Sequence, residues 1–230
     1  YNLDINNDGI SDCEWYPIYL YQQNNLVSLP YMPAEQSLDS LFFDMQDNIV
    51  KVIGAGEAGF FLNGSWIGSL TEFECSNGYW VGIITEPDTL IIENGVACDR
   101  NQVYELWTGE WNLISYLGDN GAYIGDAISD ELEPFIHSII GQGESVLQIE
   151  GTWIGSLDTL YLNKGYWIRL SDDLPNDITI DFWWEFTGED LGRSTGGNII
   201  EPNGIPFKYN QSTLQSFYYF DISKFNGNII

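Results

Sequence analysis

The start of the chain places oxygen-bearing side chains at a spacing suited to a calcium ion. Counted from residue 4, such side chains fall at positions 1, 3, 5 and 9, on Asp4, Asn6, Asp8 and Asp12. Gly9 at position 6 permits the sharp turn of a calcium loop, and the carbonyl of Ile10 would add a ligand. Position 12 is Trp15, where such loops carry Glu, so Glu14 or a second segment must complete the shell. The alternative is an acidic, Asn-rich tail that holds no ion.

The chain has 3 cysteines, and we predict a disulfide between Cys75 and Cys98. Residues 78–84 and 89–93 are expected to form an antiparallel hairpin. The two cysteines are nearly equidistant from its turn, so they should face each other just beyond its open end, within disulfide reach. Cys13 is left outside this pair.

Two Asn-x-Ser sequences, at Asn63 and Asn210, fit the acceptor pattern for N-glycosylation. Asn63 precedes Gly64 at an expected tight turn, and that turn explains an asparagine there without a glycan.

Patterns that could support catalysis are weak. Residues 54–59 fit Gly-x-Gly-x-x-Gly, but a dinucleotide site needs that turn to open a helix, and Phe60 begins a stretch typical of a strand. His137, the only histidine, is expected on a helical stretch, with no Cys or second His for a metal and no nucleophile elbow elsewhere. Acidic pairs such as Asp172-Asp173 arise by default among 34 acidic residues. We therefore expect no enzyme.

The segments that would position these residues occur twice along the sequence. Residues 66–70, Trp-Ile-Gly-Ser-Leu, recur at 153–157, and Gly-Tyr-Trp at 78–80 recurs at 165–167, both at an offset of 87. One ungapped register relates residues 19–84 to 106–171. An internal repeat of this kind predicts tandem copies of one module. We expect a calcium-binding loop at 1–15, followed by repeat modules at 16–100 and 101–182. A connector at 183–206 and a C-terminal strand at 207–230 complete the chain.

Each module is expected to begin with a strand, at 16–29 and 103–117, followed by a helical stretch, at 38–49 and 124–139. A hairpin that turns at Asn63-Gly64 and the hairpin of 78–93 complete the module. The predicted class is mostly β, a β-rich α+β fold with a short helix in each module.

The tryptophans form two groups, those that recur in both copies of the repeat and those that do not. Trp66, Trp80 and their counterparts Trp153 and Trp167 recur in patterned strands, so we expect them to pack in the cores. Four others lack that equivalence and are the better candidates for a contact surface: Trp107, Trp111, Trp183 and Trp184.

The strand motif at 110–115, Glu-Trp-Asn-Leu-Ile-Ser, together with the two repeated motifs, resembles repeat modules of secreted and cell-surface bacterial proteins. The first copy departs from it at Asn24-Asn25, where the tryptophan is lost. The resemblance implies surface display and no enzyme. The loop at 4–12 is similar to those of dockerins and thrombospondin type 3 repeats, which implies Ca²⁺.

The charge balance restricts the partners. With 34 acidic and 7 basic residues the formal charge is −27, which argues against nucleic acid and against anionic membrane surfaces. No stretch approaches the ~20 apolar residues of a membrane span. The low lysine content, the many Asn and Gly residues and the cysteines favour a secreted, extracellular protein, and a start at Tyr1 suggests a processed product or fragment.

The C-terminal residues are strongly β-prone, above all Phe217, Tyr218, Tyr219, Phe220 and Ile222. They either begin a truncated third module or insert into a neighbouring copy by strand addition. We therefore expect a secreted structural protein, a spacer or subunit of an extracellular fibril, whose partner is itself. The alternative is an adhesin or carbohydrate-binding module that recognises glycans.

Overall fold

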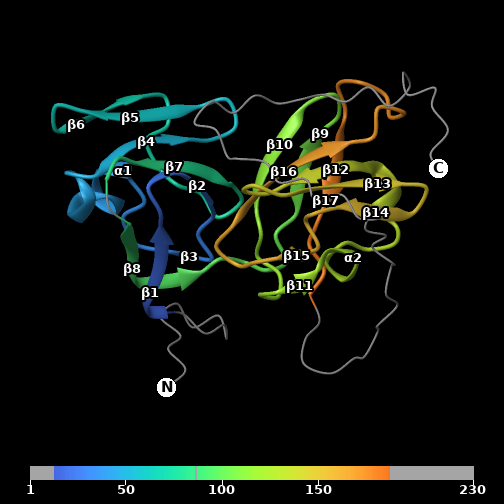
Figure 1. Ribbon diagram of the computed structural model, residues 1–230, viewed down its shortest axis with the longest axis horizontal. Helices are drawn as coiled ribbons and strands as arrows, with labels where there is room; N and C mark the ends of the chain where they lie inside the picture. The colour runs from blue at the N-terminus through green and yellow to red at the C-terminus, as the bar shows by residue number, and fades with distance from the viewer. Residues whose placement is uncertain (1–12, 86, 187–230) are drawn as a thin grey trace.

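The computed structural model describes residues 13–85 and 87–186 (Figure 1). Antiparallel strands dominate the described residues, and the helices there are single turns. The predicted mostly-β class is therefore confirmed. Two halves lie side by side along the long axis, and each is built around a five-stranded sheet.

The first half is a sandwich of two sheets. The larger has the order β2 (Gln23–Val27), β7 (Tyr79–Ile83), β4 (Ile49–Ile53), β5 (Ala58–Leu62) and β6 (Ser65–Gly68). The smaller has the order β1 (Cys13–Leu20), β8 (Asp88–Ala97) and β3 (Tyr31–Met32). Two short helical turns also contribute to this half, α1 (Leu38–Leu41) and η1 (Phe43–Met45).

The core of this half follows from alternation along the strands, which sends successive side chains to opposite faces. Ile18 of β1 and Ile92 of β8 meet Val52 and Val81 of the larger sheet in one buried cluster. Phe42, between α1 and η1, packs in the same cluster. Burial of each such side chain contributes roughly 1.5–3 kcal/mol.

The second half repeats the larger sheet in the order β10 (Trp111–Ser115), β16 (Gly165–Leu170), β12 (Ile136–Ile140), β13 (Ser145–Ile149) and β14 (Thr152–Gly155). Two-stranded ladders join β9 (Tyr104–Trp107) to β17 (Thr179–Phe182) and β11 (Ala122–Tyr123) to β15 (Thr159–Leu160). The helical turns are α2 (Ile124–Ala127) and η2 (Glu133–Phe135).

The larger sheets correspond strand for strand. Strands β4, β5 and β6 recur as β12, β13 and β14 with the same bounds at the offset of 87. Their pairing recurs as well, since Phe60 opposes Ile67 and Leu147 opposes Ile154. Even the irregularity after Ile49 in the pairing of β4 with β7 returns after Ile136.

A close backbone approach explains the glycine of the repeated Trp-Ile-Gly-Ser-Leu motif. A Cβ on Gly68 would lie 2.0 Å from the carbonyl oxygen of Ala58, and one on Gly155 would lie 2.1 Å from that of Ser145. The next two N–H groups, of Ser69 and Leu70, both donate to Ala58, which ends the pairing and turns Leu70 into the core.

The two halves meet through reciprocal contacts. The Ser115 N–H donates to the carbonyl of Ser76 at 3.0 Å, and the Ser28 N–H donates to the carbonyl of Asn163 at 3.2 Å. The repeat makes Ser28 equivalent to Ser115 and Ser76 equivalent to Asn163. Each half therefore donates one hydrogen bond to the other and accepts the equivalent bond from it. Reciprocal contacts of this kind relate the two halves by a two-fold axis.

The helical predictions were wrong in extent. Residues 46–49 and 136–139 were expected to continue helices, but β4 begins at Ile49 and β12 at Ile136, and His137 lies in β12. Pro134 lies in the first turn of η2, where its missing N–H has no intrahelical partner to lose. The apolar residues after each turn alternate along strands instead of lining a helix.

Three strand predictions also need correction. The expected strands 16–29 and 103–117 are each broken in two, into β1 and β2 and into β9 and β10. The expected hairpin of 78–93 does not form, because β7 pairs with β2 and β4 whereas β8 pairs with β1 and β3.

The predicted connector at 183–206 starts too early, because Trp184 is buried in the second core against Tyr116 and Phe182.

Candidate functional site

The structure places the predicted site residues in two groups. The calcium ligands Asp4, Asn6, Asp8, Ile10 and Asp12 lie outside the described residues, as do Asn210 and the C-terminal residues Phe217, Tyr218, Tyr219, Phe220 and Ile222. Asn63 lies inside them, exposed at the turn between β5 and β6, with a φ of 52° followed by 78° at Gly64. Among the described residues, no group of three His, Cys, Asp or Glu side chains could hold a metal.

The predicted disulfide between Cys75 and Cys98 is present, with Cα atoms 5.7 Å apart. Cys75 precedes β7 and Cys98 follows β8, so the bond ties the larger sheet of the first half to the smaller one. A bond of this kind persists in oxidising compartments.

The inner edge of each five-stranded sheet is covered at the two-fold axis. On β2, the Gln142 side chain accepts from the Leu26 N–H at 2.9 Å and donates to the Asn24 carbonyl at 3.1 Å. On β10, the Leu113 carbonyl accepts from the Gly78 N–H at 3.4 Å. Edge groups that would otherwise be available to another strand are thus bonded within the molecule.

The outer edges are different. In the described residues the sheets end at β6 and β14, and neither strand pairs with a further strand on its outer side. Figure 1 shows these two strands at opposite ends of the long axis. Their sequences, Ser-Trp-Ile-Gly and Thr-Trp-Ile-Gly, contain neither the charged residues nor the proline that commonly protect a sheet edge.

An apolar ridge flanks each outer edge on the face directed away from the core. In the first half it consists of Phe60, Leu62 and Ile67, all exposed, and Phe60 and Ile67 are direct cross-strand partners. The second half has the same ridge at the equivalent positions, Leu147, Ile149 and Ile154. Two of the three residues differ between the copies, but all three positions are apolar in both.

The opposite face of the same hairpins is core. Trp66 lies 5.7 Å from Phe42 and 5.4 Å from Phe61, measured between ring centroids, and its counterpart Trp153 is fully buried. The Trp153 indole N–H also donates to Glu133 at 2.7 Å. Folding therefore accounts for the inward side chains of these hairpins and leaves the outward ones unexplained.

The tryptophan predictions hold only in part. Trp66 and Trp153 do pack on the cores, but Trp80 and Trp167 lie on the outer faces, because the buried Tyr79 and Tyr166 precede them. Of the four proposed contact residues, Trp107 is exposed, whereas Trp184 is a core residue whose indole N–H donates to the carbonyl of Ser115 at 2.7 Å. Trp111 and Trp183 are half-buried.

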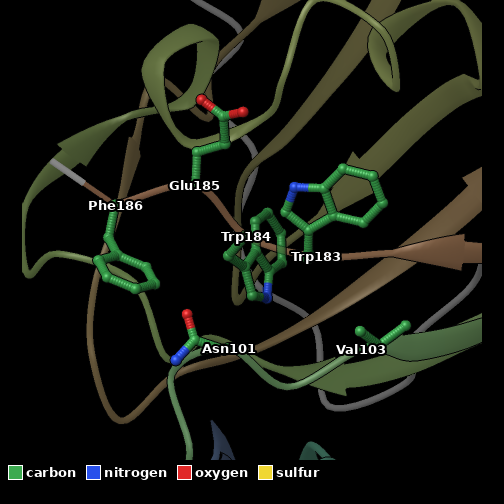
Figure 2. Close-up of a pocket in the computed structure, with 6 residues that line it drawn as sticks. All are labelled: Asn101, Val103, Trp183, Trp184, Glu185 and Phe186. Atoms are coloured by element: carbon green, nitrogen blue, oxygen red, sulfur yellow. The ribbon is translucent and has the colours of Figure 1, made fainter.

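A second surface feature is a groove of about 310 Å³ beside the last described residues (Figure 2). Trp183 and Phe186 lie on either side of Trp184, with Asn101 and Val103 opposite and the Glu185 carboxylate directed away from them. The Arg100 guanidinium lies 4.2 Å from the centre of the Phe186 ring. The sequence indicated Trp183 and Trp184 as contact residues but not Phe186 or the polar residues of this groove.

Two equivalent carboxyl groups sit beside the repeated glycine turns. Burial raises the pKa of Glu57, and the neighbouring Glu74 raises it further. Burial and Asp158 raise the pKa of Glu144, an effect that the Lys164 ammonium opposes. Burial lowers the pKa of Lys164 itself.

Comparison with protein-family models, with curated proteins and with solved structures gives no match to this chain. Within the described residues, no helix has the length and apolar character needed to cross a membrane.

Proposed function

We propose that this protein is a non-enzymatic, secreted structural subunit that assembles with copies of itself by strand addition. Residues 207–222 of one copy would pair with an outer sheet edge of the next. The observation that carries the proposal is the pair of uncharged outer edges, β6 and β14, each flanked by an exposed apolar ridge.

The two copies of the repeat can be compared at these exposed positions. Side chains this exposed contribute less to folding than core residues do, yet three outward positions stay apolar in both copies while Phe60 is replaced by Leu147 and Leu62 by Ile149. Apolar patches and open edges of this kind mark interaction surfaces or aggregation sites. A contact made by a partner strand explains why such a surface is retained.

Other features suit the same role. A net charge of −27 keeps free subunits apart in solution, which suppresses unspecific contacts through the exposed ridges. The disulfide suits an oxidising extracellular setting. Calcium at Asp4, Asn6, Asp8, Ile10 and Asp12 would stiffen the N-terminus next to β1 without taking part in any reaction.

Negative-stain electron microscopy of the intact protein, over a range of concentrations and at moderate salt to screen the charge, tests the proposal. We expect filaments whose length grows with concentration. Single particles of one size at every concentration would overturn the proposal.

The groove of Figure 2 supports a second candidate, a glycan-binding function. Aromatic rings at Trp183 and Phe186 near the Asn101 amide are groups of the kind that bind the faces and hydroxyls of sugars. Titration with a panel of oligosaccharides, followed by tryptophan fluorescence, tests it. Binding that Trp183→Ala abolishes would support this function, and no response to any of them would reject it.

A further inference from the structure

The two outer edges are equivalent in topology but not in exposure. On the ridge beside β6, the exposed fractions are 42% for Phe60, 51% for Leu62 and 59% for Ile67. On the ridge beside β14, they fall to 39% for Leu147 and 40% for Ile149, and Ile154 is only half-exposed. The ridge of the first half therefore has more apolar surface to offer a partner.

A second difference lies at the end of the first sheet. Phe43 of η1 is 68% exposed, which makes it the most exposed large apolar side chain among the described residues. It follows Phe42, which contacts Trp66 of β6 on the inner face. Figure 1 shows α1, just before η1, at the same end of the molecule as β6. At the offset of 87, the second half carries Asp130 in place of Phe43.

The charge of the C-terminal segment is complementary to the rest of the chain. Residues 207–230 contain 2 of the 7 basic residues, Lys208 and Lys224, but only 1 of the 34 acidic ones, Asp221. The rest of the chain then holds 33 acidic and 5 basic residues. A weakly cationic, aromatic segment is attracted to a strongly anionic surface.

We propose that β6, with the ridge of Phe60, Leu62 and Ile67, is the acceptor for residues 207–222 of a second copy. This assignment rests on the proposed self-assembly. The added strand pairs with the outer edge of β6 and places Tyr218, Phe220 and Ile222 on the outer face beside Ile67. Its alternate residues Phe217 and Tyr219 then point toward the inner face, where Trp66 contacts Phe42.

The proposed donor follows the second half in the chain, whereas the proposed acceptor edge belongs to the first half. The last described residues pack in the second half, where Trp184 joins the core, whereas β6 lies at the far end of the first half (Figure 1). With donor and acceptor at opposite halves, a head-to-tail contact leaves one donor and one acceptor open, and a filament results when the rotation between copies does not close a ring.

Two full-length variants test the assignment. Ile67→Lys places on the acceptor edge the residue that sheet edges use to prevent pairing. The double variant Tyr218→Lys with Phe220→Lys disables the donor. Ile154→Lys, at the equivalent position beside β14, is the matched control. Oligomer size is measured by sedimentation velocity for each variant alone and for equimolar mixtures, with circular dichroism as the check on folding.

We expect Ile67→Lys and the donor variant to sediment as monomers, Ile154→Lys to assemble like the unmodified chain, and the mixture of the first two to form 1:1 dimers. Assembly by Ile67→Lys together with loss of assembly by Ile154→Lys would overturn the assignment to β6 and leave the proposed function standing. Assembly by the donor variant would overturn the proposed function itself. If Ile67→Lys fails to fold, Leu62→Lys on the same ridge replaces it in this test, with the same expected and contradicting results.

Discussion

Gly78 and Gly165, the glycines of the two Gly-Tyr-Trp motifs, face each other across the two-fold axis between the halves. A Cβ added to Gly78 would lie 3.0 Å from the Cα of Gly165, and the reverse substitution gives the same distance. On the other sides, a Cβ on Gly78 would lie 2.9 Å from the Ile114 carbonyl and one on Gly165 would lie 3.1 Å from that of Val27. The motif therefore recurs because each copy supplies half of one backbone contact.

Substitution of Gly78 should open this contact. Gly78→Ala places a methyl group against backbone atoms that cannot rotate away, so we expect it to lower the free energy of unfolding by about 1–3 kcal/mol. Gly54→Ala is the control, since its Cβ would meet mainly the flexible Glu57 side chain, at 3.2 Å. Urea denaturation of both variants measures the difference, and equal effects would show that the halves are not held together at this point.

The double variant Gly78→Ala with Gly165→Ala gives a further prediction. Once the first methyl group has separated the halves, the second meets less resistance, so the combined loss should be smaller than the sum of the single losses. The same denaturation experiment measures it. Strictly additive losses would mean that the two glycines do not share one contact.

The disulfide should contribute substantially to stability. Cys75 and Cys98 are separated by 23 residues, and closing a loop of that length stabilises the fold by about 3 kcal/mol in the chain-entropy treatment. We expect Cys75→Ala with Cys98→Ala to lower the free energy of unfolding by about that amount, with Cys13→Ala as the control that keeps the bond. A peptide map that links Cys13 to either of the other two would contradict the pairing.

The disulfide also shows how a correct prediction can follow from an incorrect strand pairing. The expected hairpin of β7 and β8 does not exist, since the two strands belong to different sheets. They are still consecutive strands joined by a short connection, and they run in opposite directions. Positions equidistant from that connection, such as Cys75 and Cys98, therefore come together whether or not the strands are hydrogen-bonded to each other.

Among the predictions from sequence, the offset of 87 needed no assumption about fold, and β4, β5 and β6 recur at that offset as β12, β13 and β14. Helix extent was the weakest. Ile136 and Ile139 continue the spacing of apolar residues in α2, but a turn followed by a strand produces the same local spacing.

The outer ridges could not be located from sequence. Phe60 and Phe61 are adjacent and both apolar, so alternation shows that they lie on opposite faces but not which face is the core. Only the packing of Phe61 and Trp66 settles which side is buried. Trp80 and Trp167 were assigned to the cores because they recur in both copies, but recurrence does not show that Tyr79 and Tyr166 are the buried neighbours.

Calcium should stabilise the protein through the N-terminal loop. The predicted ligands are Asp4, Asn6, Asp8, Ile10 and Asp12, at the ~2.3–2.6 Å typical of calcium–oxygen contacts. We expect calorimetry to detect binding of one ion and a rise in melting temperature, both lost in Asp8→Ala. Asp44→Ala, far from the loop in sequence, is the control. No heat of binding, with an unchanged melting temperature in Asp8→Ala, would remove the site.

Glu57 should make stability depend on pH. Burial and the Glu74 carboxylate raise its pKa in the folded state. A carboxyl whose pKa is raised by folding favours the folded state fully below its unfolded pKa, and this contribution is lost as pH rises through the raised value. Glu57→Gln should therefore melt at a higher temperature than the unmodified protein at neutral pH and at the same temperature near pH ~4. The control is Glu93→Gln, on the exposed side of β8 opposite Trp15. A larger difference at the lower pH would contradict the sign.

Assembly by strand addition is tested most directly by sedimentation velocity of the chain with residues 207–230 removed. Both cores lie within residues 13–186, so the shortened chain retains them, and circular dichroism is the check on its folding. The account predicts that the intact chain forms oligomers that grow with concentration and that the shortened chain stays monomeric throughout. Oligomers of the shortened chain with the same size distribution as those of the intact chain would contradict it.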